Sequence, residues 1–313
     1  MSRELSYSQS SSPDRIGADQ AMARFRVRQL MDRETILRYL ESDRIYAAYA
    51  IGDLRPGAFG RSTWYIAECG RRLSPRRVAS GDDSEREGSA LCMQYRGRQP
   101  NVIFTMGHEE GVFEALHQNL KPSLALFSIS PDHLKAVKSL YRTGHEENMI
   151  RMHLTAKIFS TLSSDSVFRI TPNLYRELNK LYRLGSRAYF TPQDIREGVY
   201  YGIWCDGKLI SIAGTHVYEP QYGIAAVGNV FTHSDYRNRG FATACTAAVS
   251  NELLKTCRDV VLNVNASNGP AIMVYTKLGY REHCRFVEVI GARRGNWFTE
   301  TLIRWLVDRI SRM

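Results

Sequence analysis

The sequence has no apolar run that approaches the roughly 20 residues needed to cross a bilayer. Its six cysteines form no Cys-x-x-Cys pair, and no histidine stands at zinc-ligand spacing beside them. These absences predict a protein without a membrane span or a metal, whose cysteines are reduced and mostly buried. Residues 1–20 lack the apolar centre of a secretory signal, so we expect a disordered leader over residues 1–24 and a cytoplasmic protein.

The composition is that of an ordinary globular protein, with 43% hydrophobic and 24% charged residues among 313. That length exceeds the usual size of one domain and favours two. The formal net charge of +10 is compatible with nucleic acid, a membrane surface or an acidic small ligand as partner. The basic residues are scattered and no aromatic-interleaved nucleic-acid motif occurs, so we expect neither a nucleic-acid nor a membrane partner.

Hydrophobic periodicity predicts alternating helices and strands along the whole chain. In the first half it predicts a helix over residues 29–54, strands at 64–67, 90–95, 101–105 and 124–129, helices at 109–119 and 131–140, and an exposed loop over 70–88. In the second half it predicts strands at 149–159, 199–205, 208–218, 224–231, 259–265 and 281–290, and helices at 171–185, 192–197, 243–255, 270–278 and 297–310.

Three of these elements carry local signals. Thr171 or Asn173 is the expected cap of the helix at residues 171–185. Asp206-Gly207 favours a type I′ turn, so the strands on either side of it form a hairpin. The helix at residues 297–310 is amphipathic, and we expect it to pack on the core, with a homodimer contact as the alternative.

Small residues stand between the strand at 224–231 and the helix after it, in the order Arg237-x-x-Gly240-x-Ala242. A helix start leaves backbone N–H groups unpaired and carries partial positive charge. Gly240 and Ala242 let an anion approach that backbone, and Arg237 and Arg239 add guanidinium groups suited to phosphate oxygens. The segment is therefore predicted to hold a pyrophosphate. The Gly-Lys-Ser/Thr ending of a nucleotide P-loop and the Gly-x-Gly-x-x-Gly fingerprint are both missing.

A second motif, Asn265-x-x-Asn268 followed by Tyr275-x-x-x-Gly279-Tyr280, stands farther along the chain. Together, residues 230–243 and 263–280 resemble the acyl-CoA-binding and following motifs of the GNAT N-acetyltransferase superfamily. Within that superfamily, the two motifs most resemble the glycine-N-acyltransferase-like branch. The resemblance covers roughly residues 150–290.

The resemblance implies an α/β (α+β) fold of tandem GNAT-like domains, each a mixed, mostly antiparallel twisted sheet flanked by helices. Residues 25–148 would form a degenerate N-terminal domain, because Arg-x-x-Gly-x-Ala is missing there and Glu109 and Glu110 stand where an anion would bind. We expect a structural and substrate-shaping role for it. Residues 149–313 would form the catalytic domain, whose central strands splay to admit acyl-CoA and which ends with the amphipathic helix.

The resemblance also implies a reaction and its site. Acetyl-CoA, or another acyl-CoA, would be the co-substrate without any metal, and the acceptor a primary amine of a small molecule, amino acid or peptide. Tyr275 would protonate the CoA thiolate, and a backbone N–H of Val230 or Phe231 would stabilise the oxyanion. The residues implied for acyl-CoA binding are Val230, Phe231, Thr232, Arg237, Asn238, Arg239, Gly240, Phe241, Ala242, Thr243, Asn265, Asn268 and Tyr275.

The base that deprotonates the acceptor is not fixed by the sequence. An alkylammonium has a pKa near 10.4, so it must lose a proton at neutral pH. Many family members place a glutamate on the strand before the predicted pyrophosphate site, residues 237–243, which we call the cradle. In this chain, residues 225–231 contain no carboxylate. Asn229 is a candidate for ordering a water, and His216, Glu219 and His233 are candidates for acting through it.

The missing carboxylate leaves a second hypothesis open, a non-catalytic CoA-sensing or protein-interaction module on the same scaffold. A third hypothesis, a nucleic-acid-binding protein, rests only on the positive charge.

Overall fold

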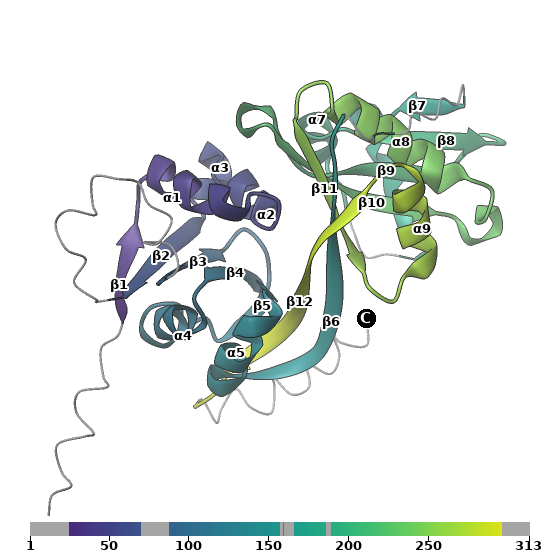
Figure 1. Ribbon diagram of the computed structural model, residues 1–313. Coiled ribbons are helices and arrows are strands. Elements are labelled where there is room, and N and C mark those ends of the chain that lie inside the picture. The colour runs from purple at the N-terminus through teal and green to yellow at the C-terminus, as the bar shows by residue number, and fades with distance from the viewer. Residues whose placement is uncertain (1–24, 70–87, 157–158, 160–165, 186–188, 296–313) are drawn as a thin grey trace, which may run out of the picture.

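The computed structural model describes residues 25–69, 88–156, 159, 166–185 and 189–295 (Figure 1). The expected leader at 1–24, nearly all of the expected loop at 70–88 and the expected helix at 297–310 lie outside these residues. No helix in the described part of the chain is long and apolar enough to cross a membrane.

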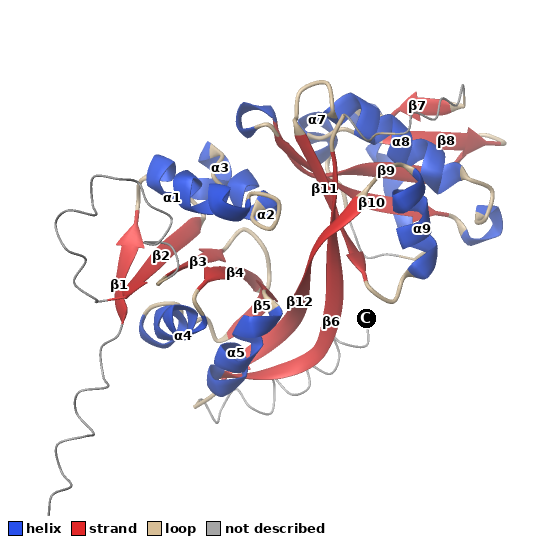
Figure 2. Cartoon of the chain, in the orientation of Figure 1, coloured by secondary structure: helices blue, strands red, loops and turns tan. Residues whose placement is uncertain are grey.

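One twelve-stranded sheet runs through the described chain (Figure 2). Its strands lie in this spatial order: β1 (Phe25–Leu30), β2 (Ser62–Cys69), β3 (Ser89–Tyr95), β4 (Asn101–Gly107), β5 (Leu124–Ile129), β12 (Arg281–Arg293), β6 (Tyr141–Leu154), β11 (Asp259–Asn265), β10 (Ile224–Thr232), β9 (Lys208–Glu219), β8 (Tyr201–Cys205) and β7 (Val167–Arg169). Only β4 with β5 and β10 with β11 pair parallel, and the other neighbours pair antiparallel. The expected mixed, mostly antiparallel sheet is confirmed.

The two long strands β6 and β12 run side by side through both halves of the molecule (Figure 1). Residues 287–292 of β12 insert between β5 and β6, and residues 149–154 of β6 insert between β12 and β11. Each half therefore repeats one strand order, in which the strand next to the parallel pair comes from the other half of the chain. This repeat confirms the tandem arrangement, and the proposed boundary between residues 148 and 149 falls inside β6.

Helices cover both faces of the sheet in each half (Figure 2). In the first half, α1 (Arg33–Leu40) and α2 (Ala48–Gly52) pack on Leu91 and Met93 of β3, whereas α4 (Glu109–Gln118) packs on its alternate residues Ala90 and Cys92. The remaining elements here are η1 (Glu41–Asp43), α3 (Pro56–Phe59), η3 (Pro131–His133) and α5 (Leu134–Leu140).

In the second half, α8 (Phe241–Leu253) and α9 (Gly269–Lys277) share one core with β10 and β11, and α6 (Tyr175–Tyr182) and α7 (Pro192–Glu197) share another with β9. Helix α2 of the first half also packs against β9 and β10. The described part of this half also contains the 3₁₀ turns η4 (Pro172–Leu174), η5 (Pro220–Tyr222) and η6 (Ser234–Tyr236).

The single helix expected over residues 29–54 is wrong. Its start belongs to β1, which pairs with β2. The rest is broken because aspartates bind backbone N–H groups locally and so start new turns. Asp32 accepts from the Thr35 N–H at 2.8 Å, and Asp43 accepts from the Tyr46 N–H at 3.0 Å.

The helix expected over residues 171–185 begins later, at Tyr175, and neither expected cap serves it. The Thr171 hydroxyl donates to the Asn173 side chain, and η4 precedes the helix. The strand expected from residue 149 already begins at Tyr141.

Several expected elements are confirmed at the same bounds: β5, α7 and β11. The hairpin of β8 and β9 is also confirmed, and its turn has positive φ at both Asp206 (47°) and Gly207 (72°), as a type I′ turn requires.

Candidate active site

The parallel strands β10 and β11 separate halfway along their length. They pair from Ile224 to Val227 of β10, and beyond that point β10 pairs only with β9. Strand β11 continues beside β6 as far as Asn265. This is the splay that was expected of the central strands of the second half.

Asn229 forms a bulge at the point of separation. Its φ is +53°, a left-handed conformation that asparagine tolerates, and the register with β9 shifts here. Its side-chain amide nitrogen donates to the Thr215 backbone carbonyl at 3.1 Å, and its backbone carbonyl accepts from the Tyr182 hydroxyl. The bulge is therefore fixed from β9 and from α6.

Backbone groups beyond the bulge point into the gap. The His233 N–H donates to the Ile210 carbonyl of β9 at 2.9 Å. Because the backbone groups of successive strand residues alternate in direction, those of Val230 and Thr232 point away from β9. A ligand that lies in the gap as an additional strand could therefore pair with them.

The gap is followed by the expected anion cradle. Gly240 has a φ of +80° and stands at the N-cap of α8, and a Cβ there would meet no atom within 4 Å. Within the described residues no side chain caps this helix, so the N–H groups of its first turn, Phe241 to Thr243, have no side-chain acceptor there. A helix start of this kind attracts an anion.

The two arginines of the cradle are braced by their neighbours. The Arg237 Nε donates to the Thr232 carbonyl at 3.2 Å, and the Arg239 guanidinium lies 5.3 Å from the ring centre of Tyr236. Asn238 between them has a φ of +61°. These contacts tie both arginine side chains to the segment between β10 and α8.

Tyr275 of α9 packs in the hydrophobic cluster that holds Val227 of β10 and Val264 of β11, the two strands that separate. Its side chain is only 8% exposed, and burial raises its pKa to about 12. The hydroxyl is therefore protonated at neutral pH, as a general acid must be.

Asn265 and Asn268 shape the turn between β11 and α9. Asn265 accepts from the Ser267 N–H at 2.9 Å, and Asn268 caps α9 by accepting from the Ala271 N–H at 3.2 Å. Their spacing in the sequence thus has a structural cause in addition to the predicted contact with CoA.

Two of the candidate bases are less suited to the role: Glu219 lies away from the gap, and His233 caps a 3₁₀ turn. Glu219 stands opposite Ile224, at the paired end of β10, where burial raises its pKa and Arg55 lies 3.6 Å away. His233 accepts from the Asp235 N–H at 3.2 Å and so caps η6. Only His216 and Asn229 come together, at 3.2 Å between Nε2 and Oδ1.

Sequence reasoning missed further side chains here, among them one from α2 of the first half and one from β6. The Tyr49 hydroxyl of α2 lies 3.1 Å from the Nδ1 of His216. Arg151 of β6 is 2% exposed and places its guanidinium 5.0 Å from the Tyr49 ring centre. Asp53, just beyond α2, has a pKa raised to about 7 by burial, but the charges that act on it include Arg55 and Glu219 at the paired end of β10 and not His216. No local signal marks these residues, because Tyr49 and His216 are 167 positions apart.

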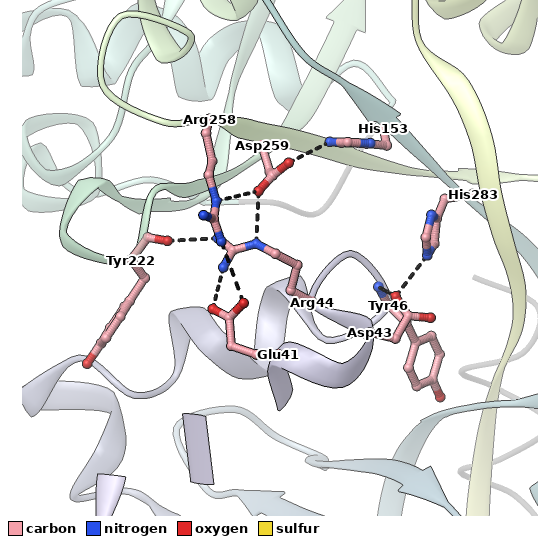
Figure 3. Close-up of polar contacts among 9 residues, drawn as sticks. All are labelled: Glu41, Asp43, Arg44, Tyr46, His153, Tyr222, Arg258, Asp259 and His283. Carbon is pink, nitrogen blue, oxygen red and sulfur yellow. Dashed lines mark hydrogen bonds and ion pairs between the residues drawn. The ribbon is translucent and has the colours of Figure 1, made fainter. Parts of the chain in front are cut away.

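A separate interface network joins η1 to the second half at the opposite, paired end of β10 and β11 (Figure 3). Asp259 forms ion pairs with Arg44 at 2.8 Å and with His153 at 2.9 Å, and Asp43 contacts His283 at 2.8 Å. We call the following residues the interface network: Glu41, Asp43, Arg44, His153, Arg258, Asp259 and His283.

Comparison with known sequences finds a family match and a partial relative. The model of the family described as "FR47-like protein" matches residues 200–288, which include the gap, the cradle and Tyr275. The human cysteine-rich protein 2-binding protein is 28% identical over 168 residues, covering 49% of this chain and 21% of that protein. The chain thus spans about a fifth of this curated relative.

Comparison with solved structures finds the same fold over most of the chain. A Drosophila protein matches with a TM-score of 0.59 at 13% identity, covering 85% of this chain and 98% of its own. A GCN5-related N-acetyltransferase from Sphaerobacter thermophilus matches with a TM-score of 0.53 at 15% identity, covering 87% and 97%. These likenesses establish the GNAT fold, and the family match supports the superfamily resemblance.

Proposed function

We propose that the protein is an acyl-CoA-dependent N-acyltransferase of the glycine-N-acyltransferase-like branch. It transfers acetyl from acetyl-CoA to a primary amine of a small molecule, amino acid or peptide. The observation that carries this proposal is the gap between β10 and β11, which leads to the uncapped start of α8 at Gly240. A strand-like arm ending in a pyrophosphate, as CoA has, matches both parts of that surface.

The cofactor would be held mainly by backbone. The groups of Val230 and Thr232 bond the pantetheine arm as a neighbouring strand would, and the N–H groups from Gly240 to Thr243 bind the pyrophosphate. Arg237, Asn238, Arg239 and Asn268 complete the cradle. No step needs a metal.

The chemistry is a direct attack of the amine on the thioester carbonyl. The C–N bond forms, the C–S bond breaks, and the N–H of Val230 stabilises the oxyanion in between. Phe231, the alternative donor expected from the sequence, is excluded because its backbone faces β9. Tyr275 gives its proton to the departing thiolate. Its burial next to Val227 and Val264 supports this role, because the hydroxyl remains protonated until it is used.

The experiment that tests this function is acetyl-CoA binding by calorimetry on the full chain. We expect Gly240→Ala to weaken binding, since a Cβ and a strained φ of +80° would disturb the N–H groups that face the pyrophosphate. Gly223→Ala is the matched control, because Gly223 also has a positive φ (+64°) but lies at the other end of β10. Wild-type protein that is folded and binds no acetyl-CoA would falsify the proposal.

Release of free thiol from acetyl-CoA distinguishes an enzyme from a CoA-sensing or interaction module. We expect release with at least one amine of a panel of glycine, benzylamine, putrescine and a tripeptide with a free N-terminus. Binding of acetyl-CoA without release across the whole panel favours the non-catalytic module, for which the missing carboxylate on β10 is the supporting observation.

A further inference from the structure

A chain of hydrogen bonds crosses from the first half of the molecule to the bulge in β10. The Tyr49 hydroxyl of α2 lies 3.1 Å from Nδ1 of His216, and Nε2 of His216 lies 3.2 Å from Oδ1 of Asn229. Helix α2 packs against both β9 and β10, so the contact is part of the joint between the halves.

The direction of these bonds follows from the groups at their ends. Thr215 offers a carbonyl, which only accepts, so the Asn229 amide nitrogen faces it and the amide oxygen faces His216. The Nε2 of His216 must then carry the proton. Its Nδ1 is left with a lone pair that accepts from the Tyr49 hydroxyl.

The imidazole is held directly over the separating strand. A Cβ at Gly228 would lie 2.4 to 2.5 Å from three atoms of the His216 ring, so the ring occupies space that only glycine leaves. Gly228 is the first residue of β10 beyond its pairing with β11. His216 therefore stands at the mouth of the gap, and burial lowers its pKa, which keeps it neutral at pH 7.

Tyr49 cannot act as a base by itself. Burial raises its pKa well above the ordinary tyrosine value, so it holds its proton unless a neighbour takes it. Both Tyr49 and His216 retain solvent-accessible surface, so an acceptor can reach the hydroxyl. The charged and titratable groups that act on the pair are Arg98, from the loop between β3 and β4, Arg151 of β6, Tyr275 of α9 and Glu288 of β12.

We propose that Tyr49 is a catalytic residue supplied by the N-terminal half, which relays the acceptor's proton to His216. This inference rests on the acyl transfer proposed above. The acceptor ammonium gives a proton to the Tyr49 oxygen as the Tyr49 O–H proton passes to Nδ1 of His216. The free amine then attacks the thioester, and Tyr275 protonates the thiolate. The amine nitrogen carries an extra proton after the attack and gives it to the Tyr275 oxygen, and the imidazolium of His216 returns its proton to solvent.

The test is the pH dependence of kcat/KM for the acceptor, with the amine that the panel identifies. In the wild type, kcat/KM should level off once His216 is neutral. In Tyr49→Phe only the free-base amine reacts, so kcat/KM should rise tenfold per pH unit toward the amine's own pKa, about 10.4 for an alkylamine and about 7.7–8.0 for a peptide N-terminus. The deficit at pH 7 should be about 10²- to 10⁴-fold, and it should shrink as the pH rises.

Tyr46→Phe is the matched control. The Tyr46 hydroxyl donates to the Thr105 carbonyl at 2.9 Å inside the first half and does not reach His216. Its removal costs a buried hydrogen bond of similar kind, yet the pH profile should keep the wild-type shape. Calorimetry should show unchanged acetyl-CoA affinity in both variants, which excludes general damage.

A second variant separates the relay from a structural role. His216→Gln should give the same profile as Tyr49→Phe, and the double variant should be no slower than either, because both act in one proton path. A Tyr49→Phe profile with the wild-type shape overturns the relay and leaves the acyltransferase standing. Absence of acetyl-CoA binding or of acetyl transfer in the wild type overturns both.

Discussion

At the residue scale, the two tyrosines beside each other in the core of the second half have different surroundings. The Tyr280 hydroxyl bonds to the Ser250 hydroxyl at 2.8 Å inside the protein. Tyr275, 6.1 Å away between ring centres, receives no such bond from the described residues and lies among the apolar side chains beside the gap. A hydroxyl that makes no bond to the described protein here remains available to a ligand in the gap, as the proposed general acid requires.

This difference predicts unequal effects when each hydroxyl is removed. Tyr275→Phe should bind acetyl-CoA as the wild type does and lower kcat by about 10²-fold, the lower end for a general acid. Tyr280→Phe should keep its kcat and lose about 1 kcal/mol of stability with the bond to Ser250. Calorimetry and thiol release measure the two effects. Equal turnover of Tyr275→Phe and wild type would remove the general-acid assignment.

At the element scale, one buried amide closes the segment that follows α6. The Asn179 Nδ2 donates to the Phe190 carbonyl at 2.8 Å, and its Oδ1 accepts from the Phe190 N–H at 2.8 Å. Helix α6 also supplies Tyr182, which bonds the bulge at Asn229. The amide therefore holds the element that fixes the mouth of the gap.

Asn179→Asp should destabilise the protein, since a carboxylate would face the Phe190 carbonyl without a proton to donate. We expect a loss of about 1–3 kcal/mol or more in the free energy of unfolding, as for a buried group left unsatisfied. Urea unfolding followed by circular dichroism measures it. The exposed Asn173→Asp should change stability by less than about 0.5 kcal/mol. Equal stability of the two variants would contradict this account.

Local elements were predictable from the sequence where short-range signals decide them. Asp206-Gly207 identified its hairpin, and the β-branched run at 259–265 identified β11 at its observed bounds. The helix expected over 29–54 failed because Asp32 and Asp43 restart the chain through their own side chains. The helix after β10 was predictable because a helix start is decided locally, although it begins at Phe241 and not at the expected Thr243.

The relay partner of His216 was not readable. His216 was a candidate, but nothing near it in the sequence indicates Tyr49, which reaches it only through the packing of α2 on β9. The insertion of β6 and β12 into each other's half of the sheet, which we call their exchange, was also not predictable. Each strand pairs with partners from both halves, and these partners are far away in the sequence.

At the scale of the whole molecule, the interface network makes stability depend on acid pH (Figure 3). Burial alone would raise the pKa of Asp259, but the hydrogen bond with His153 and the charges of Arg44 and Arg258 outweigh it and lower the pKa. An aspartate with a depressed folded pKa stabilises the fold fully above its unfolded pKa, about 3.9, and loses that contribution as the pH falls through the folded value.

Asp259→Asn should therefore be less stable than the wild type at neutral pH, and the difference should narrow as the pH falls below about 4. Chemical unfolding at a series of pH values from neutral to acid measures this. Asp235→Asn, which removes a carboxylate that is 77% exposed, should show a small difference at every pH. If the free energies of unfolding of Asp259→Asn and wild type differed by the same amount at every pH, the ion pairs of Asp259 would not be the cause of the pH dependence.

The exchange of β6 and β12 also has a consequence for synthesis. In the first half, β5 and β6 are joined through residues 287–292 of β12, which pair with both strands. The ribosome adds these residues well over a hundred residues after β6. At about 5–20 residues per second the first half waits several seconds or more with two unpaired strand edges. Translation order therefore makes the first half depend on the second, and a nascent chain stalled before residue 287 should attract chaperones that bind open strand edges.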